Sequence, residues 1–163
     1  MFTQPEDDFS HIVSTSTLKL GGNLEEVIIP RNSKIFLALF SSRVQAGFVS
    51  PADDYLEKTL DLNEYLIDHP AASFFVRVSG HSMIGAGIHD NDLLIVDRSL
   101  KAKHGSIIIA AINGELTVKR LKIQNGHYIL APENSDYPAL EITEEMEFIV
   151  WGVVTTVVHQ LNK

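Results

Sequence analysis

The sequence predicts a mainly β protein, in which an antiparallel sheet is rolled or folded on itself and is accompanied by one or two short helices and an N-terminal arm. Short runs of β-branched and aromatic residues recur after residue 70, and polar turns separate them. Two Asn-Gly pairs, at 113–114 and 125–126, stand between such runs as they do in tight hairpins. Strands do not alternate with helices, which disfavours a parallel α/β fold.

The first fifty residues are typical of an arm, because they are rich in Ser, Thr, Asn and Gly and show no sustained hydrophobic period. Two apolar pieces of this arm, residues 27–29 and 35–40, are expected to dock as strand-like segments. Ser50, an N-cap residue followed by proline, predicts the start of a helix with Leu56 and Leu60 as its apolar stripe.

The later part of the chain predicts strands. Its apolar runs are short and are bounded by Gly, Asn or Pro, which favours strands over helices. The predicted strands are residues 74–78, 93–96, 107–112, 116–123, 128–131 and 148–158. The first of them leads into a polar loop over residues 81–90. The last is long and rich enough in β-branched residues to be a central strand of the sheet.

Length and charge limit the class of protein. At 163 residues the chain is about one domain long, on a prior of roughly 150 residues per domain. A formal net charge of -8 argues against direct binding to nucleic acid or to an anionic membrane. There is no cysteine, the first residues are acidic where a secretory signal is basic, and no apolar run approaches the roughly 20 residues of a membrane span. We expect a cytoplasmic protein.

No metal or cofactor site is expected. The seven histidines include no i,i+4 pair, which zinc sites on helices use. The glycine-containing stretch 80–87 lacks the Lys-Ser/Thr of a phosphate-binding loop. Asp90, Asp92 and Asp97 lack the glycine and terminal glutamate of a calcium-binding loop, so we interpret them as turn and strand-end residues.

Ser82 and Lys119 are the residues that could carry chemistry. Ser82 follows a strand end in a glycine-flanked loop, where backbone N–H groups can face a developing oxyanion. Its hydroxyl needs a base, and Lys119 is the unusual candidate. Strand alternation places Lys119 on one face with Thr117, Leu121 and Ile123, where burial would lower the pKa of its amine. The pattern alone favours an ordinary loop serine and a lysine that reaches solvent over a catalytic pair.

Two motifs show a resemblance to a known family. Ser79-Gly80-His81-Ser82-Met83, followed by Thr117-Val118-Lys119-Arg120, resembles the Ser-Lys self-cleaving family of LexA and UmuD, and within it the UmuD branch. The resemblance covers roughly residues 36–163 and includes Val44-Gln45-Ala46-Gly47-Phe48. It implies the fold of the LexA C-terminal domain, with residues 1–46 as an arm removed by self-cleavage and residues 47–163 as the peptidase and polymerase-accessory domain.

The resemblance also implies roles for single residues. Ser82 is then the nucleophile, Lys119 the general base, and the backbone amides of His81 and Ser82 the oxyanion hole of a serine endopeptidase. The bond between Ala46 and Gly47 is the cleavage site. A RecA filament stimulates the cut in the SOS response to DNA damage, and the truncated homodimer joins the UmuC Y-family polymerase for translesion synthesis. The cut is made in cis or in trans.

The chain departs from the family in places, and alternatives stay open. The 46 residues before the cleavage site lack two helical periods and a basic face, which disfavours a DNA-binding repressor. The arm is longer than is usual in the UmuD branch, and no role is predicted for residues 1–31. His81 stands where an acidic residue is common, and we expect it to face solvent. A non-cleaving interaction module with a vestigial dyad is the main alternative. A signal peptidase, which has a similar dyad, would need a membrane anchor.

Overall fold

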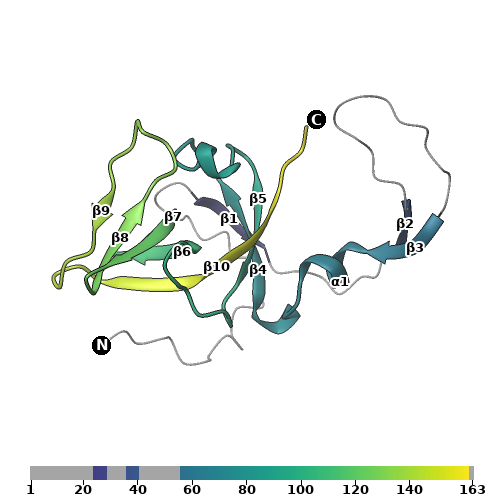
Figure 1. The fold of residues 1–163 in the computed structure, drawn as a ribbon, viewed down its shortest axis with the longest axis horizontal. Coiled ribbons are helices and arrows are strands. Elements are labelled where there is room, and N and C mark those ends of the chain that lie inside the picture. The colour runs from purple at the N-terminus through teal and green to yellow at the C-terminus, as the bar shows by residue number, and fades with distance from the viewer. Residues whose placement is uncertain (1–23, 29–35, 41–55, 162–163) are drawn as a thin grey trace. The chain divides into compact units, whose positions relative to one another are not determined.

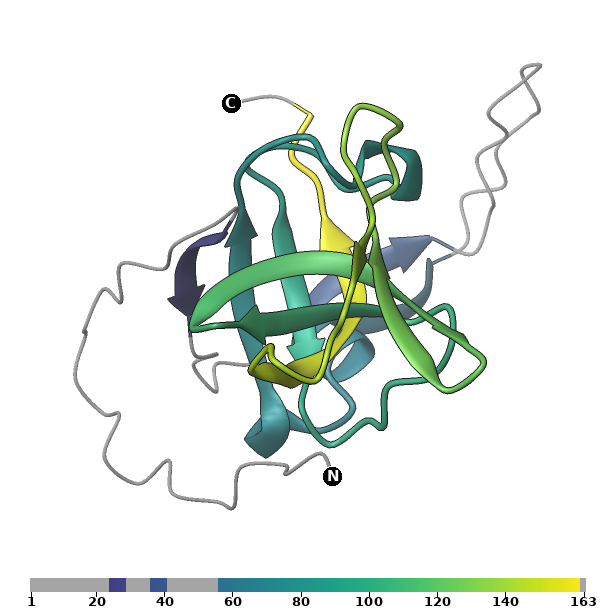
Figure 2. The ribbon, with the colours of Figure 1, turned by 90° about the vertical axis from the view of Figure 1, so that its left-hand side faces the viewer.

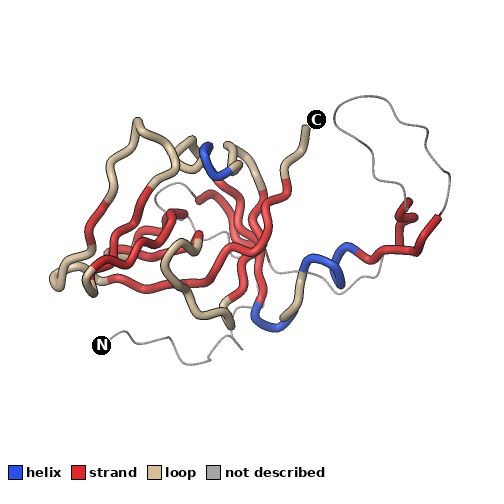
Figure 3. The backbone as a smooth tube through the Cα atoms, viewed as in Figure 1, coloured by secondary structure: helices blue, strands red, loops and turns tan. Residues whose placement is uncertain are grey.

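The computed structural model describes residues 24–28, 36–40 and 56–161. The chain divides into two units, one formed by residues 1–30 and 69–163 and the other by residues 31–68. Strands, red in Figure 3, are the main secondary structure of the described residues in both units. Within the described ranges, no helix is long and apolar enough to cross a membrane.

The larger unit is built on one antiparallel sheet, which confirms the predicted fold class (Figures 1 and 2). The strands follow the order β1-β4-β5-β10-β6-β7-β8-β9. Their bounds are β1 Leu24–Ile28, β4 Ser73–Val78, β5 Leu93–Asp97, β6 Ile107–Ile112, β7 Glu115–Gln124, β8 His127–Ala131, β9 Leu140–Glu141 and β10 Phe148–Val158. Two 3-10 turns, Pro70–Ala72 and Ile84–Ala86, precede β4 and β5. The apolar piece predicted at residues 27–29 thus belongs in part to strand β1.

Strand β10 makes the sheet fold over. Its first half pairs with β6 and its second half pairs with β5, with a register shift in each half. Bulges of this kind bend a strand and increase its twist. Gly152 lies at the shift, where an added Cβ would come within 2.7 Å of Val96 Cγ1. The bend therefore needs a residue without a side chain, and it brings the β4–β5 half of the sheet over the β6–β9 half.

Apolar side chains fill both faces of this folded sheet. One cluster joins β4 and β5 to β6 and β7 and includes Val76, Met83, Val96, Ile109 and Val118. A second cluster lies on the other face of β6 and β7 and includes Ile108, Ala110, Leu121 and Leu130. Strand alternation along β6 and β7 separates the two clusters.

The two predicted hairpins are confirmed. Asn113 and Gly114 have φ values of 50° and 85°, and Asn125 and Gly126 have values of 50° and 83°. A type I′ turn requires positive φ at both central residues, which Asn and Gly tolerate best. These turns join β6 to β7 and β7 to β8.

The smaller unit holds an antiparallel pair, β2 (Phe36–Phe40) with β3 (Leu56–Asp61), followed by the short helix α1 (Leu62–Leu66). The predicted strand-like segment at 35–40 is confirmed by β2. The predicted helix with Leu56 and Leu60 is wrong over the described residues, because both lie in β3. Residues four apart share a face in a strand as well as in a helix, and pairing with β2 decides between the two. Ser50 lies outside the described residues.

Candidate active site

The loop that carries Ser82 is fixed at its entrance and at its centre. After β4 ends, Gly80 takes a φ of 92° and donates its N–H to Asp90 Oδ1 at 2.7 Å. A positive φ of this size favours glycine, so the turn out of the strand depends on this residue. Met83 is 1% exposed and anchors the loop in the first apolar cluster. Ser82 is itself buried, with 5% exposure.

The segment after β8 clamps this loop from outside. Glu133 donates its N–H to the Ser82 carbonyl at 2.8 Å and accepts from the Gly85 N–H at 2.7 Å. An added Cβ on Gly85 would lie 2.5 Å from the Glu133 carbonyl oxygen, so glycine allows the two backbones to approach. Asn134 Nδ2 donates to the His81 carbonyl at 2.9 Å. In a trans peptide the N–H points opposite to the C=O, so the Ser82 N–H is directed away from Asn134.

Lys119 comes from the middle of β7, on the face of the second apolar cluster. It pairs with Ile108 of β6, and its neighbour two residues on, Leu121, is buried in that cluster. Burial lowers the pKa of the Lys119 amine from 10.5 to about 8. The desolvated ammonium form is the costly one, so a neutral amine becomes available near physiological pH.

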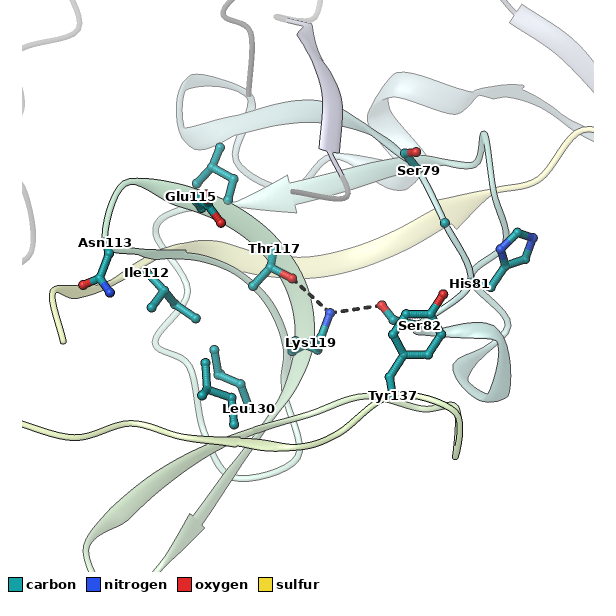
Figure 4. Close-up of a pocket in the computed structure, with 13 residues that line it drawn as sticks. Ser79, His81, Ser82, Ile112, Asn113, Glu115, Thr117, Lys119, Leu130 and Tyr137 are labelled. Atoms are coloured by element: carbon teal, nitrogen blue, oxygen red, sulfur yellow. Dashed lines mark hydrogen bonds between the residues drawn. The ribbon is translucent and has the colours of Figure 1, made fainter. Parts of the chain in front are cut away.

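Ser82 and Lys119 meet across the fold (Figure 4). Lys119 Nζ lies 3.0 Å from Ser82 Oγ, 3.0 Å from Thr117 Oγ1 and 2.9 Å from the Val118 carbonyl oxygen. As an ammonium, Nζ donates to all three. As a neutral amine it has two N–H groups and one lone pair. The Val118 carbonyl can only accept and Thr117 can take the second N–H, so the lone pair is left for the Ser82 hydroxyl.

The pair lies in an open cleft of about 730 Å³. The cleft is lined by residues of the Ser82 loop, the β6–β7 hairpin, β8 and the segment that leads to β9. Tyr137 and Leu140 are 41% and 38% exposed and form apolar parts of its wall. His81 also borders the cleft and is exposed, so the expectation that it faces solvent is confirmed. Figure 4 shows Lys119 between Thr117 and Ser82, with Tyr137 beside the serine.

The structure brings together Ser82, Lys119 and His81, whereas Ala46 and Gly47 lie outside the described residues. Sequence reasoning placed Thr117 on the face of Lys119 but gave it no part in the site. It missed Glu133, whose contacts with the Ser82 loop are made through its backbone. No residue type signals a backbone contact between distant segments, so only the fold reveals it.

The aspartates considered as cation ligands serve other contacts. Asp92 and Asp97 are 2% and 3% exposed. Asp92 Oδ1 lies 2.5 Å from His159 Nδ1, and Asp97 Oδ2 lies 2.6 Å from His69 Nδ1. Among the residues that the structure describes, no group of three His, Cys, Asp or Glu residues is arranged to hold a metal ion.

An antiparallel β domain with a serine and a half-buried lysine in contact in an open cleft has the layout expected of a Ser-Lys hydrolase. The chain belongs to the Peptidase S24-like family, which matches residues 38–155. Within it the chain falls in the UmuD group, which confirms the resemblance stated from the motifs.

Three relatives illustrate the extent of the similarity. Protein ImpA of Escherichia coli is 51% identical over 125 residues, which cover 77% of this chain and 85% of ImpA. Protein MucA of Salmonella typhimurium is 48% identical over 120 residues, covering 73% of this chain and 82% of MucA. The LexA repressor of Paracidovorax citrulli is 35% identical over 131 residues, covering 80% of this chain and 58% of the repressor.

Proposed function

We propose that this protein is a UmuD-like serine endopeptidase that cuts its own chain between Ala46 and Gly47. The observation that carries the proposal is the contact between Ser82 Oγ and Lys119 Nζ, in a chain of the Peptidase S24-like family. A lysine whose pKa is lowered to about 8 can serve as a general base close to neutral pH.

The reaction follows from these groups. The neutral Lys119 amine takes the proton of Ser82 Oγ as this oxygen attacks the carbonyl carbon of Ala46. The backbone N–H groups of His81 and Ser82 stabilise the oxyanion of the tetrahedral intermediate. Its collapse breaks the C–N bond, and the Lys119 ammonium gives its proton to the leaving amine of Gly47. The ester between Ala46 and Ser82 is then hydrolysed by water, with Lys119 again as the base.

The substrate suits a site of this shape. Ala46 and Gly47 have no atoms beyond Cβ, so a chain that is extended there can approach Ser82 closely. Val44 and Phe48 can contact apolar wall residues such as Tyr137 and Leu140. Because the arm is tethered to the peptidase domain, docking has a high effective concentration and the rate is controlled by how often the arm is bound.

We propose the corresponding cellular role by similarity to the UmuD group. A RecA filament that forms in the SOS response to DNA damage favours the docked arm, and the resulting domain of residues 47–163 acts as a homodimer with a UmuC-type Y-family polymerase in the cytosol. In this role the protein needs no direct contact with DNA, in agreement with its net charge of -8.

Intact mass spectrometry of the purified chain, followed over time with and without RecA filaments, tests the proposal. We expect fragments that end at Ala46 and begin at Gly47. Ser82→Ala and Lys119→Ala should abolish them, whereas Lys122→Ala, a matched change on the same strand, should not. Processing in either of the first two variants contradicts the mechanism. A chain that stays intact beside RecA filaments supports instead an interaction module that acts uncut.

A further inference from the structure

The outer edge of β4 is covered by β1. Strand β1 precedes the proposed cleavage site in the sequence, whereas β4 follows it. Strand β1 pairs with β4 in antiparallel register, with Val27 opposite Val76 and Ile28 opposite Phe75 (Figures 1 and 2). In the order of the sheet, β1 is the terminal strand and β4 is the next. Without β1, β4 would be an open edge.

The backbone of β4 shows which groups this edge strand covers. The N–H and C=O of Val78 both bond toward the β5 side, to the Asp92 carbonyl and from the Asn91 N–H, each at 2.9 Å. Along an antiparallel strand these groups point to alternate sides. The backbone groups of Phe75 and Arg77 therefore point away from β5 and toward β1.

We propose that residues 24–28 are a detachable edge strand, which closes β4 in the uncut chain and is released by the cut. The docking itself is independent of the proposed peptidase function, whereas the physiological release rests on it. In the uncut chain, residues 29–72 connect the two strands and keep β1 at an effective concentration of about millimolar. The cut removes this connection. The N-terminal fragment is then held in a bimolecular contact by two short pairings, β1 with β4 and β2 with β3, and strand pairs of this size are marginal in water.

The released edge is a docking site for an extended peptide strand of another chain. Main-chain bonds to Phe75 and Arg77 would supply affinity, as in other cases of strand addition. The register of β1 places Glu26 opposite Arg77, Val27 opposite Val76 and Ile28 opposite Phe75. Opposite charges at facing positions favour pairing. The chemistry is thus an acidic residue followed by two apolar β-branched residues.

Two proline variants test the docking in the full chain, with Ser82→Ala present to prevent self-cleavage. In Ile28→Pro the lost N–H is one that faces β4 through the pairing with Phe75. In the matched control Val27→Pro the lost N–H faces away from β4, a position that an edge strand tolerates. We expect hydrogen exchange at the Phe75 and Arg77 amides to rise by about tenfold or more in Ile28→Pro and far less in Val27→Pro. Unchanged exchange at Val76 and Val78 shows that the fold is intact. Equal exchange at Phe75 and Arg77 in both variants overturns the docking.

Release is tested without relying on self-cleavage. A recognition sequence for a site-specific protease, inserted between Ala46 and Gly47 of the Ser82→Ala chain, allows the cut to be made at will. We expect the N-terminal fragment to separate from the domain on gel filtration at micromolar concentration, and the Phe75 and Arg77 amides to lose protection. A synthetic peptide of residues 22–31 should restore that protection, and its Glu26→Lys version should do so more weakly. A fragment that stays bound, or amides that stay protected after the cut, overturn the release. The result is the same whether or not the native chain cleaves itself.

Discussion

Glu133 holds Ser82 in place through its backbone: its N–H bonds to the Ser82 carbonyl at 2.8 Å, and its own carbonyl accepts from Gly85 in the same loop. The side chain of Glu133 is in turn paired with Arg120, the residue next to Lys119 on β7. Through Glu133, the position of Ser82, the proposed nucleophile, is thus coupled to β7, the strand that carries the proposed base Lys119. Since small misplacements of reacting groups cost large factors in rate, this coupling should be visible in kinetics.

Gly85→Ala tests the clamp. The added Cβ meets the Glu133 carbonyl oxygen, so the loop or the clamp must move. Overpacking of this kind costs about 1–3 kcal/mol of stability. We expect the rate of self-cleavage, measured by intact mass, to fall by about tenfold or more. Gly126→Ala is the control for a general loss of stability, because it strains a backbone of positive φ in the β7–β8 turn, away from the residues that line the cleft. Equal losses of rate in the two variants would show that stability, and not the clamp, controls cleavage.

The pH dependence of self-cleavage should follow the lowered pKa of Lys119. Below a pKa of about 8 the neutral fraction of the amine falls about tenfold per pH unit. The rate should therefore rise with pH up to about 8 and level off above it. First-order rates measured from pH 6 to pH 10 give the midpoint. A rate that keeps rising to the ordinary lysine value of 10.5 would mean that Lys119 is solvated when it acts.

Thr117→Val removes the hydroxyl that accepts from Lys119 Nζ and keeps the shape of the side chain. We expect the plateau rate to fall by about fivefold, equivalent to about 1 kcal/mol for one hydrogen bond. The pKa midpoint should also move to lower pH, because the ammonium loses an acceptor. Thr117→Ser retains the hydroxyl and should leave both quantities close to those of the parent. An unchanged pH profile in Thr117→Val would remove Thr117 from the mechanism.

Asp97 should make the stability of the fold depend on pH in the acidic range. Burial works to raise the pKa of Asp97, but hydrogen bonds from Ser99 and His69 and the charge of His69 outweigh it, so the folded-state pKa is lowered. A lowered pKa stabilises the fold above the unfolded value of about 3.9, and that stability is lost as pH falls through the folded value. In the Ser82→Ala background, Asp97→Asn should lower Tm at pH 7 by about 6 °C, for a loss of about 2 kcal/mol.

Thermal unfolding of both chains from pH 3 to pH 7 makes the comparison. The difference in Tm between the parent and Asp97→Asn should narrow as pH falls below the unfolded value of about 3.9 toward the lower folded-state pKa of the parent carboxyl. A difference in Tm that stays constant across this range would mean that Asp97→Asn lowers stability through packing and not through the loss of the carboxylate charge.

The sequence by itself determined the features that depend only on residues adjacent in the chain. The Asn113-Gly114 turn is one, because positive φ is a local property of Asn and Gly. The motifs around Ser82 and Lys119 are another, since they indicated the family before any contact was known. The sequence did not decide whether Leu56 and Leu60 lie in a helix or a strand, because a spacing of four suits both and the partner strand β2 settles it.

Only the tertiary structure decided how the site is assembled. Ser82 follows β4 and Lys119 lies in β7, and they meet because the bulged strand β10 folds one half of the sheet over the other. The lowered pKa of Lys119 depends on how far that folding removes water from its amine. The clamp by Glu133 and the pairing of β1 with β4 are backbone contacts between distant segments. Their hydrogen-bonding groups are the same in every residue except proline, so the sequence carries no local signal for them.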